Sequence, residues 1–149
     1  MSKTLPPMSE LFLDAISQSE TVLAGHTEIQ SDRWTMVIAA ADSEVGDMTI
    51  WDDGDELTVD IGQKYHSHFC PLMQDGYSEL ERRRSAAKSA LKFVQQTLND
   101  SVNFRIEYVN GNCKSASCWN INSSDHGPSP QTDAFLTFKW SGVTERFGT

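Results

Sequence analysis

Two histidines separated by a single residue, His66 and His68, are the side chains best placed to do chemistry in this sequence. Apolar and polar residues alternate from Leu57 to Ile61, which predicts a strand with one buried and one exposed face. If the alternation continues, both imidazoles share the exposed face with Asp60. Imidazole nitrogens bind zinc or iron and titrate near neutral pH, so the pair fits a metal site or general acid–base catalysis.

Either kind of site would need further residues around the imidazoles. Candidate third ligands for a metal are Asp60, His26, His126 or a residue of a neighbouring strand. Asp60 could also orient an imidazole, with Ser67 or Cys70 as the nucleophile. The sequence has no G-x-S-x-G, H-E-x-x-H or C-x-x-C motif. We therefore assign no catalytic residue, metal ligand or cofactor, and keep a metal-binding protein or enzyme that uses His66 and His68 as the alternative.

A run of acidic residues precedes the histidines, and no lysine or arginine interrupts it. Its members are Asp42, Glu44, Asp47, Asp52, Asp53, Asp55, Glu56 and Asp60. Aspartate is a natural turn former, so these could be solvated residues of two hairpin turns. They could also form a negative binding surface, either as one face or as two separate tips.

The overall charge favours a basic protein as partner. The net charge is −9, from 21 acidic and 12 basic residues, which disfavours nucleic acid and anionic membranes and speeds encounter with a positively charged protein. The one basic cluster is Arg82, Arg83, Arg84, Lys88 and Lys92. We expect it to be the solvated face of a helix that pairs with the acidic edge of a sheet.

Helices and strands are predicted from periodicity. A short helix is expected at about 9–19 with Ser9 as its N-cap, and a long helix from Tyr77 to Asn99. Strands are expected at 34–41, 48–51, 57–61, 102–108, near 119–121, 135–140 and 143–147, with hairpin turns at Asp53-Gly54 and Asn110-Gly111. The predicted fold class is α+β, with an antiparallel sheet of about five to six strands packed against one long helix and a short N-terminal helix.

The 149 residues fit a single domain, 1–149, with a flexible lead-in at 1–8 and a mobile, proline-containing loop at 122–132. No apolar run is long enough to span a membrane, and no targeting segment is visible. Three cysteines, Cys70, Cys113 and Cys118, are expected to be free thiols, which suits the cytoplasm. Trp51, Trp119 and Trp140 are expected to pack in the core.

Four segments, which together cover less than half of the chain, resemble a group of small bacterial α+β proteins. They are TIWDDGDELTVDIG, KYHSHF, SELERRRSAAKSALKFVQQTL and VNFRIEYVNGN. Many members of that group are immunity proteins of polymorphic or contact-dependent toxin systems. The resemblance implies an intracellular protein that neutralises a cognate toxin, often through an acidic surface complementary to a basic cleft. It assigns no role to any particular residue.

The sequence thus predicts a non-catalytic, acidic protein-binding module, most simply an immunity-type inhibitor of a basic toxin or nuclease. The acidic run from Asp42 to Asp60 would form its binding surface, and the protein would be a monomer or a homodimer. A phage-encoded inhibitor that mimics nucleic acid is a further alternative, suggested by the same acidity.

Overall fold

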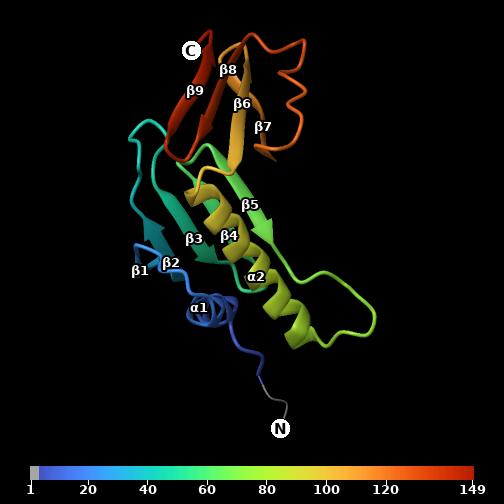
Figure 1. The fold of residues 1–149 in the computed structure, drawn as a ribbon. Coiled ribbons are helices and arrows are strands. Elements are labelled where there is room, and N and C mark those ends of the chain that lie inside the picture. The colour runs from blue at the N-terminus through green and yellow to red at the C-terminus, as the bar shows by residue number, and fades with distance from the viewer. Residues whose placement is uncertain (1–3) are drawn as a thin grey trace.

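The computed structural model describes residues 4–149, which form two helices and nine strands (Figure 1). The elements are α1 (Met8–Gln18), β1 (Gly25–Gln30), β2 (Arg33–Ile38), β3 (Met48–Asp52), β4 (Leu57–Ile61), β5 (Tyr65–Phe69), α2 (Glu79–Leu98), β6 (Val102–Val109), β7 (Asn112–Asn120), β8 (Ala134–Lys139) and β9 (Gly142–Phe147). No helix in this described part has both the length and the apolar character needed to cross a membrane.

The long helix α2 begins where its sequence favours a start. Ser78 accepts a hydrogen bond from the Glu81 backbone N–H at 3.2 Å, and the Glu81 carboxylate accepts one from the Ser78 backbone N–H at 2.8 Å. This reciprocal pair satisfies two backbone donors that the helix itself leaves free. The buried stripe of α2 includes Ala87, Leu91 and Val94, as the periodicity predicts.

The short helix α1 begins one residue earlier than predicted and is capped by a distant residue. Pro7 occupies the N-cap position and provides no side-chain hydrogen bond, so the prediction of Ser9 as N-cap is wrong. The Ser9 backbone N–H instead donates to Asp52 Oδ2 at 2.8 Å. Of the lead-in predicted at 1–8, residues 1–3 lie outside the described residues, and Met8 is fully buried in α1.

Strands β1 to β5 form one antiparallel sheet in sequence order, here called sheet A. The predicted meander of three strands corresponds to β2, β3 and β4, and β1 and β5 extend it at either edge. Leu57, Val59 and Ile61 are fully buried beneath the helices. Both helices pack on this one side, so sheet A has a helix side and an open face (Figure 1).

Strands β6 to β9 form a second antiparallel sheet, sheet B, in the order β7-β6-β8-β9. The predicted α+β class with a long helix is confirmed, and the single antiparallel sheet of five to six strands is matched only roughly, because there are two antiparallel sheets, of five and four strands. Helix α2, about 30 Å long, runs back beside β5 to the end of sheet A where β5 starts, and β6 begins there (Figure 1). There β6 pairs with β7 on one edge and β8 on the other, so neither of its edges is free to join sheet A.

Aromatic side chains join the two sheets into one core. The rings of Tyr65 in sheet A and Phe104 in sheet B lie 5.1 Å apart, and Phe104 also stacks on Phe138 at 5.1 Å. Phe93 of α2 completes the group, 6.3 Å from both Tyr65 and Phe104. Sheet B therefore closes one end of the layer formed by sheet A and its helices.

Candidate functional site: the open face of sheet A

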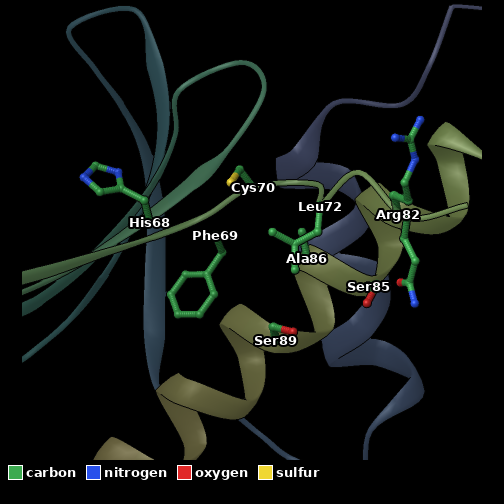
Figure 2. A pocket seen from close by; sticks show the side chains of 9 residues that line it. His68, Phe69, Cys70, Leu72, Arg82, Ser85, Ala86 and Ser89 are labelled. Carbon is green, nitrogen blue, oxygen red and sulfur yellow. The ribbon is translucent and has the colours of Figure 1, made fainter.

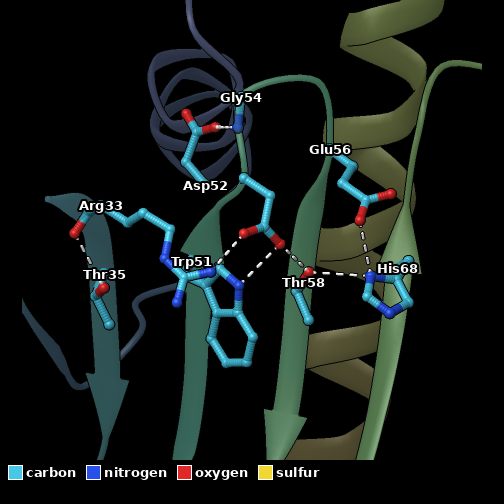
Figure 3. A network of polar contacts seen from close by, with 9 residues as sticks. Arg33, Thr35, Trp51, Asp52, Gly54, Glu56, Thr58 and His68 are labelled. Atoms are coloured by element: carbon cyan, nitrogen blue, oxygen red, sulfur yellow. Dashed lines mark hydrogen bonds and ion pairs between the residues drawn. The ribbon is translucent and has the colours of Figure 1, made fainter. Parts of the chain in front are cut away.

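The open face of sheet A collects side chains from all five strands. Strand register places on it His26 and Glu28 of β1, Arg33, Thr35 and Val37 of β2, Thr49 and Trp51 of β3, Thr58 and Asp60 of β4, and His66 and His68 of β5. Figure 3 views this face, with both helices behind the strands. It is the broadest polar surface that the sheet leaves uncovered by helices.

Asp53, at the end of the face, is the centre of a hydrogen-bond network. Its carboxylate accepts from Arg33 Nη1 at 2.6 Å, from Trp51 Nε1 at 2.8 Å and from the Thr58 hydroxyl at 2.6 Å. Partial burial raises the pKa of Asp53, but the hydrogen bonds from Thr58, Arg33 and Trp51 outweigh it, so the pKa lies below its usual value. The Arg33 guanidinium also lies 5.3 Å from the centre of the Trp51 ring. The indole is thus held in place on two sides.

His68 joins the same network through its Nδ1 atom. Nδ1 lies 2.9 Å from Glu56 Oε1 and 3.1 Å from Thr58 Oγ1 (Figure 3). The Thr58 hydroxyl gives its hydrogen to Asp53, so its oxygen is an acceptor toward His68. We infer that Nδ1 is protonated and directs its hydrogen toward Glu56 and Thr58.

The predicted placement of the histidine pair on one exposed face is confirmed. His66 and His68 are both exposed, with ring centres 5.1 Å apart and planes at 79°. Asp60 lies opposite His66 across β4 and β5 and accepts from the Gln63 backbone N–H at 2.8 Å. Burial raises the pKa of Asp60 above its usual value, although the Gln63 hydrogen bond and the His66 charge act in the other direction.

The other predicted partners of the histidines lie elsewhere. Ser67 is on the helix side of β5, so it cannot act with an imidazole on the open face. His26 is on β1, at the opposite edge of the sheet, and His126 is in the loop beside sheet B. Cys70 is exposed just after β5. All three cysteines are free thiols, as predicted.

Three groups of the network could converge on a cation. Ligand atoms of Asp53, Glu56 and His68 lie within 4.8 Å of one another. These atoms already have partners: Glu56 Oε1 and His68 Nδ1 lie 2.9 Å apart, and Arg33 Nη1 lies 2.6 Å from Asp53 Oδ1. A cation would have to displace the Nδ1 proton and compete with the guanidinium. The geometry therefore favours a hydrogen-bonded network over a metal centre.

A pocket of about 200 Å³ opens beside the network, between the end of β5 and α2 (Figure 2). Phe69, Leu72 and Ala86 give it an apolar floor, and Arg82 and Ser85 lie along its side. His68 is also among the residues that line it, although its ring points away from Leu72 and Ala86 (Figure 2). His68 therefore borders both the pocket and the hydrogen-bond network.

The predicted acidic surface is divided between two ends of sheet A. Asp52, Asp53, Asp55 and Glu56 lie at the turn between β3 and β4, and Asp42, Glu44 and Asp47 lie in the loop between β2 and β3. Asp60 is near that second end, opposite Thr49. A five-residue strand of about 17 Å separates the ends. The sequence allowed either one acidic face or two separate acidic tips, and the structure has two tips.

The tip between β2 and β3 is tied to the protein. Asp42 accepts from the backbone N–H groups of Glu44 and Val45 at 2.9 and 3.3 Å, and Asp47 accepts from Ala40 at 2.8 Å. Both carboxylate oxygens of Glu44 accept from Arg146 of sheet B, at 2.7 and 2.6 Å. These carboxylates form the loop and its junction with sheet B.

The tip between β3 and β4 has one carboxylate, that of Asp55, for which the structure gives no hydrogen bond to the rest of the described chain. Asp52 accepts from Ser9 and Gly54 backbone groups at 2.8 and 2.7 Å. Asp55, in contrast, has a fully exposed side chain, and its ion pair with Arg83 is long, at 3.7 Å. Arg83 itself is buried and donates to the Pro6 carbonyl at 3.1 Å. Asp55 is therefore the acidic residue best placed to meet a partner.

A second polar cluster lies on sheet B, around a buried arginine. The Arg105 side chain is 4% exposed and donates to both oxygens of Asp125, at 2.8 and 2.7 Å. Its guanidinium lies 4.9 Å from the Trp119 ring and 5.5 Å from the Phe135 ring. This arrangement fastens the loop predicted to be mobile, 122–132, at Asp125.

Glu107 fastens the same loop at a second place. Its carboxylate accepts from the Ser129 backbone N–H and the Thr132 hydroxyl, both at 2.6 Å, and from Ser115 at 3.0 Å. The Thr132 hydrogen bond lowers the pKa of Glu107, and together with those from Ser129 and Ser115 it outweighs burial. The Arg105 hydrogen bonds hold the pKa of Asp125 at about 2. Both groups of the cluster are thus stabilised in their ionised forms.

We expect this cluster to make the fold sensitive to acid. Both pKa values are lower in the folded chain than in the unfolded chain, so the stability they provide is present above the usual carboxyl pKa. It is lost as the pH falls toward about 2, where Asp125 takes up a proton. Unfolding free energies of the wild type and Asp125→Asn should differ at neutral pH and converge in that range. A difference that stays constant down to pH 2 would contradict the assignment.

Two of the tryptophans are not where the sequence suggested. Trp140 is buried, as predicted, but Trp51 and Trp119 are only partly buried and lie outside the core cluster. Each instead stacks with an arginine, Arg33 or Arg105, on the surface of a sheet. The sequence alternation indicated this position for Trp51, because neighbouring residues of a strand face opposite sides and Met48 and Ile50 of the same strand face the core.

Comparison with protein-family models, with curated proteins and with solved structures finds no match to this chain.

Proposed function

We propose that this protein is a non-catalytic protein-binding module, an immunity-type inhibitor that binds a basic toxin or nuclease. The binding surface is the open face of sheet A together with the acidic turn between β3 and β4. The observation that carries the proposal is Trp51, an aromatic side chain held rigidly among carboxylates on a face that no helix covers in residues 4–149.

Trp51 has the features of an interface anchor. Tryptophan and arginine are enriched among the residues that contribute most to binding energy, and Arg33 lies against the indole. The hydrogen bond to Asp53 fixes the ring before a partner arrives, so little side-chain freedom is lost on binding. A partly buried, pre-positioned indole is also a large apolar area that a partner can cover.

The charges around Trp51 suit a basic partner. Asp55, Glu56 and Asp60 all lie on the open face or at its β3–β4 end, and Asp55 projects fully into solvent. Charges on the rim of an interface mainly raise the association rate, and salt screens them. The second tip, at Asp42–Asp47, meets sheet B through Glu44 and Arg146, so it acts on a partner only over longer range.

The surroundings of the histidines support binding rather than catalysis. His68 Nδ1 faces Glu56 and Thr58. The Thr58 hydroxyl already donates its hydrogen to Asp53, so His68 cannot take that proton to make Thr58 a nucleophile. Ser67 faces the other side of the strand. Within this proposal, His66 and His68 are contact residues at the β5 edge of the surface.

Charge reversal at Asp55 tests the proposal. The probe is a purified basic nuclease domain of a bacterial toxin, and binding is followed by surface plasmon resonance at low and high salt. Asp55→Lys should slow association several-fold at low salt, and less at high salt, with little effect on dissociation. Trp51→Ala should instead speed dissociation, because the anchor is lost.

The matched control is Glu20→Lys, which makes the same charge change at an exposed residue just after α1. Equal association rates for the two charge variants would show that the acidic turn does not guide the partner. A wild-type protein that neither binds the toxin nor protects cells that express it would reject the inhibitor function itself.

A further inference from the structure

Strand β1 is an edge of sheet A with unusual exposure. All six residues from Gly25 to Gln30 are exposed, and the strand pairs with β2 without interruption, from Gly25 opposite Ile38 to Gln30 opposite Arg33. Its other edge has no neighbouring strand in the described residues. A regular strand with one unpaired edge is a template for a further strand.

The turn after β1 determines which backbone groups are unpaired. Ser31 and Asp32 form a two-residue turn with φ of 49° and 62°, the geometry of a tight type I′ hairpin. Gln30 and Arg33 are then a hydrogen-bonded pair, and such pairs alternate along the hairpin. Gln30, Glu28 and His26 therefore bond to β2, and Gly25, Thr27 and Ile29 direct their N–H and C=O groups outward.

Both edge strands of sheet B carry features that hinder pairing, and β1 lacks them. Strand β7 contains Lys114 and an irregular register with β6, and β9 contains Arg146 and an irregular register with β8. Charged side chains and bulges of this kind keep edges from adding strands. Strand β1 has an unbroken register, no proline and no lysine or arginine.

We propose that β1 pairs with β1 of a second copy of this chain, antiparallel, with Thr27 opposite Thr27. In this register every outward N–H and C=O group of Gly25, Thr27 and Ile29 finds a partner. The two copies are related by a twofold axis perpendicular to the sheet. Their open faces then adjoin on the same side of one continuous sheet.

Side chains on the open face favour this register. His26 of each copy lies opposite Glu28 of the other, and a carboxylate facing an imidazole across two strands is a favourable pair. Within one strand the two side chains are already 3.8 Å apart. Shifting the centre from Thr27 to Glu28 would instead oppose the Glu28 carboxylates of the two copies, which repel.

Side chains on the helix side fit as well. Gly25 of each copy lies opposite Ile29 of the other, and Ile29 is 69% exposed in the single chain. A Cβ at Gly25 would lie 3.0 Å from Met36 Cγ, so the Met36 side chain reaches over the glycine. Ile29 of the second copy would pack over Gly25, beside the buried Met36, which removes apolar surface of Ile29 from water.

Analytical ultracentrifugation of the full chain, in reducing buffer because Cys70 and Cys113 are exposed thiols, tests the pairing. The wild type should dimerise within the micromolar to millimolar range. Thr27→Pro removes the outward N–H at the twofold axis and should weaken the dimer by tenfold or more, with unchanged circular dichroism, because an edge strand tolerates proline at such a position. Thr27→Ala keeps the N–H and should dimerise like the wild type.

A charge exchange tests the register. Glu28→Lys should weaken the dimer, and the double variant His26→Glu/Glu28→Lys should restore it, since glutamate then faces lysine. A wild type that stays monomeric at millimolar concentration overturns the proposal. So does a folded Thr27→Pro variant that dimerises as tightly as Thr27→Ala. These outcomes are independent of whether the open face binds a toxin.

Discussion

Substitution of Gly62 by alanine is expected to destabilise the fold by about 4 kcal/mol or more, the range of the most disruptive single substitutions. Gly62 has φ of 61°, a conformation that costs other residues about 1–2 kcal/mol. A Cβ at this position would also lie 1.6 Å from the Val45 carbonyl oxygen and 2.7 Å from its carbon. The backbone itself would have to move, because neither atom belongs to a flexible side chain.

Gly54→Ala is the matched control for this effect. Gly54 has φ of 94°, also unfavourable for alanine, but a Cβ there would meet nothing within 4 Å. Gly54→Ala should therefore lower the free energy of unfolding only by the backbone conformational cost, about 1–2 kcal/mol. Urea unfolding of both variants measures the difference. Equal midpoints would show that the loop at Val45 yields easily and that the contact with Gly62 contributes little.

The Gly62 contact also positions the acidic loop between β2 and β3. The Gly62 backbone N–H donates to the Asp47 carbonyl at 2.8 Å, and Lys64 Nζ donates to the Val45 carbonyl at 3.3 Å. A Cβ at Gly46 would in turn lie 2.7 Å from Gly62 Cα. The two turns thus approach so closely that glycine is needed on both sides, and the loop holds its carboxylates on a rigid base.

The spacing of apolar residues in the sequence predicted those helices and strands that bury one face along their whole length. Helix α2 and strands β3 and β4 have apolar residues at helical or alternating spacing, and they were found close to their expected bounds. Strand β1 was missed because its six residues are all exposed, so no apolar alternation marks it. The division into two sheets was missed because alternation indicates which face is buried, whereas strand pairing depends on contacts between distant segments such as Phe104 and Tyr65.

The acidic residues also show that local sequence patterns do not reveal contacts between distant segments. Their abundance indicated a negative surface, and their spacing indicated turns, but neither signal identified their partners. Asp52 caps α1 from 43 residues away, and Glu44 pairs with Arg146 from 102 residues away. These contacts appear only once the chain is folded. A carboxylate such as Asp55, which is fully exposed and held by a long ion pair with Arg83, therefore carries more information about a partner than the net charge does.

Replacement of Arg105 by methionine is the other substitution expected to have a large effect, a loss of about 3 kcal/mol, because the buried guanidinium makes two hydrogen bonds to a carboxylate and such charged bonds contribute about 1.5–3 kcal/mol. Methionine retains most of the volume between Trp119 and Phe135 but gives up both hydrogen bonds to Asp125 and the bond to Thr137 at 3.2 Å. It also removes the positive charge near Glu107, which is 8% exposed and cannot readily rehydrate.

Arg146→Met provides the comparison, because it removes an arginine–carboxylate pair in which both side chains are nearly half exposed. Exposed pairs contribute about 0–1 kcal/mol, so this variant should unfold close to the wild type. Hydrogen exchange should separate the two further. Arg105→Met should speed exchange at Gly127 and Ser129, whose backbone N–H groups donate to Asp125 and Glu107, and Arg146→Met should leave them unchanged. Similar losses of stability in the two variants would mean that burial adds nothing to the Arg105 pair, and that the loop between β7 and β8 is held by its other contacts.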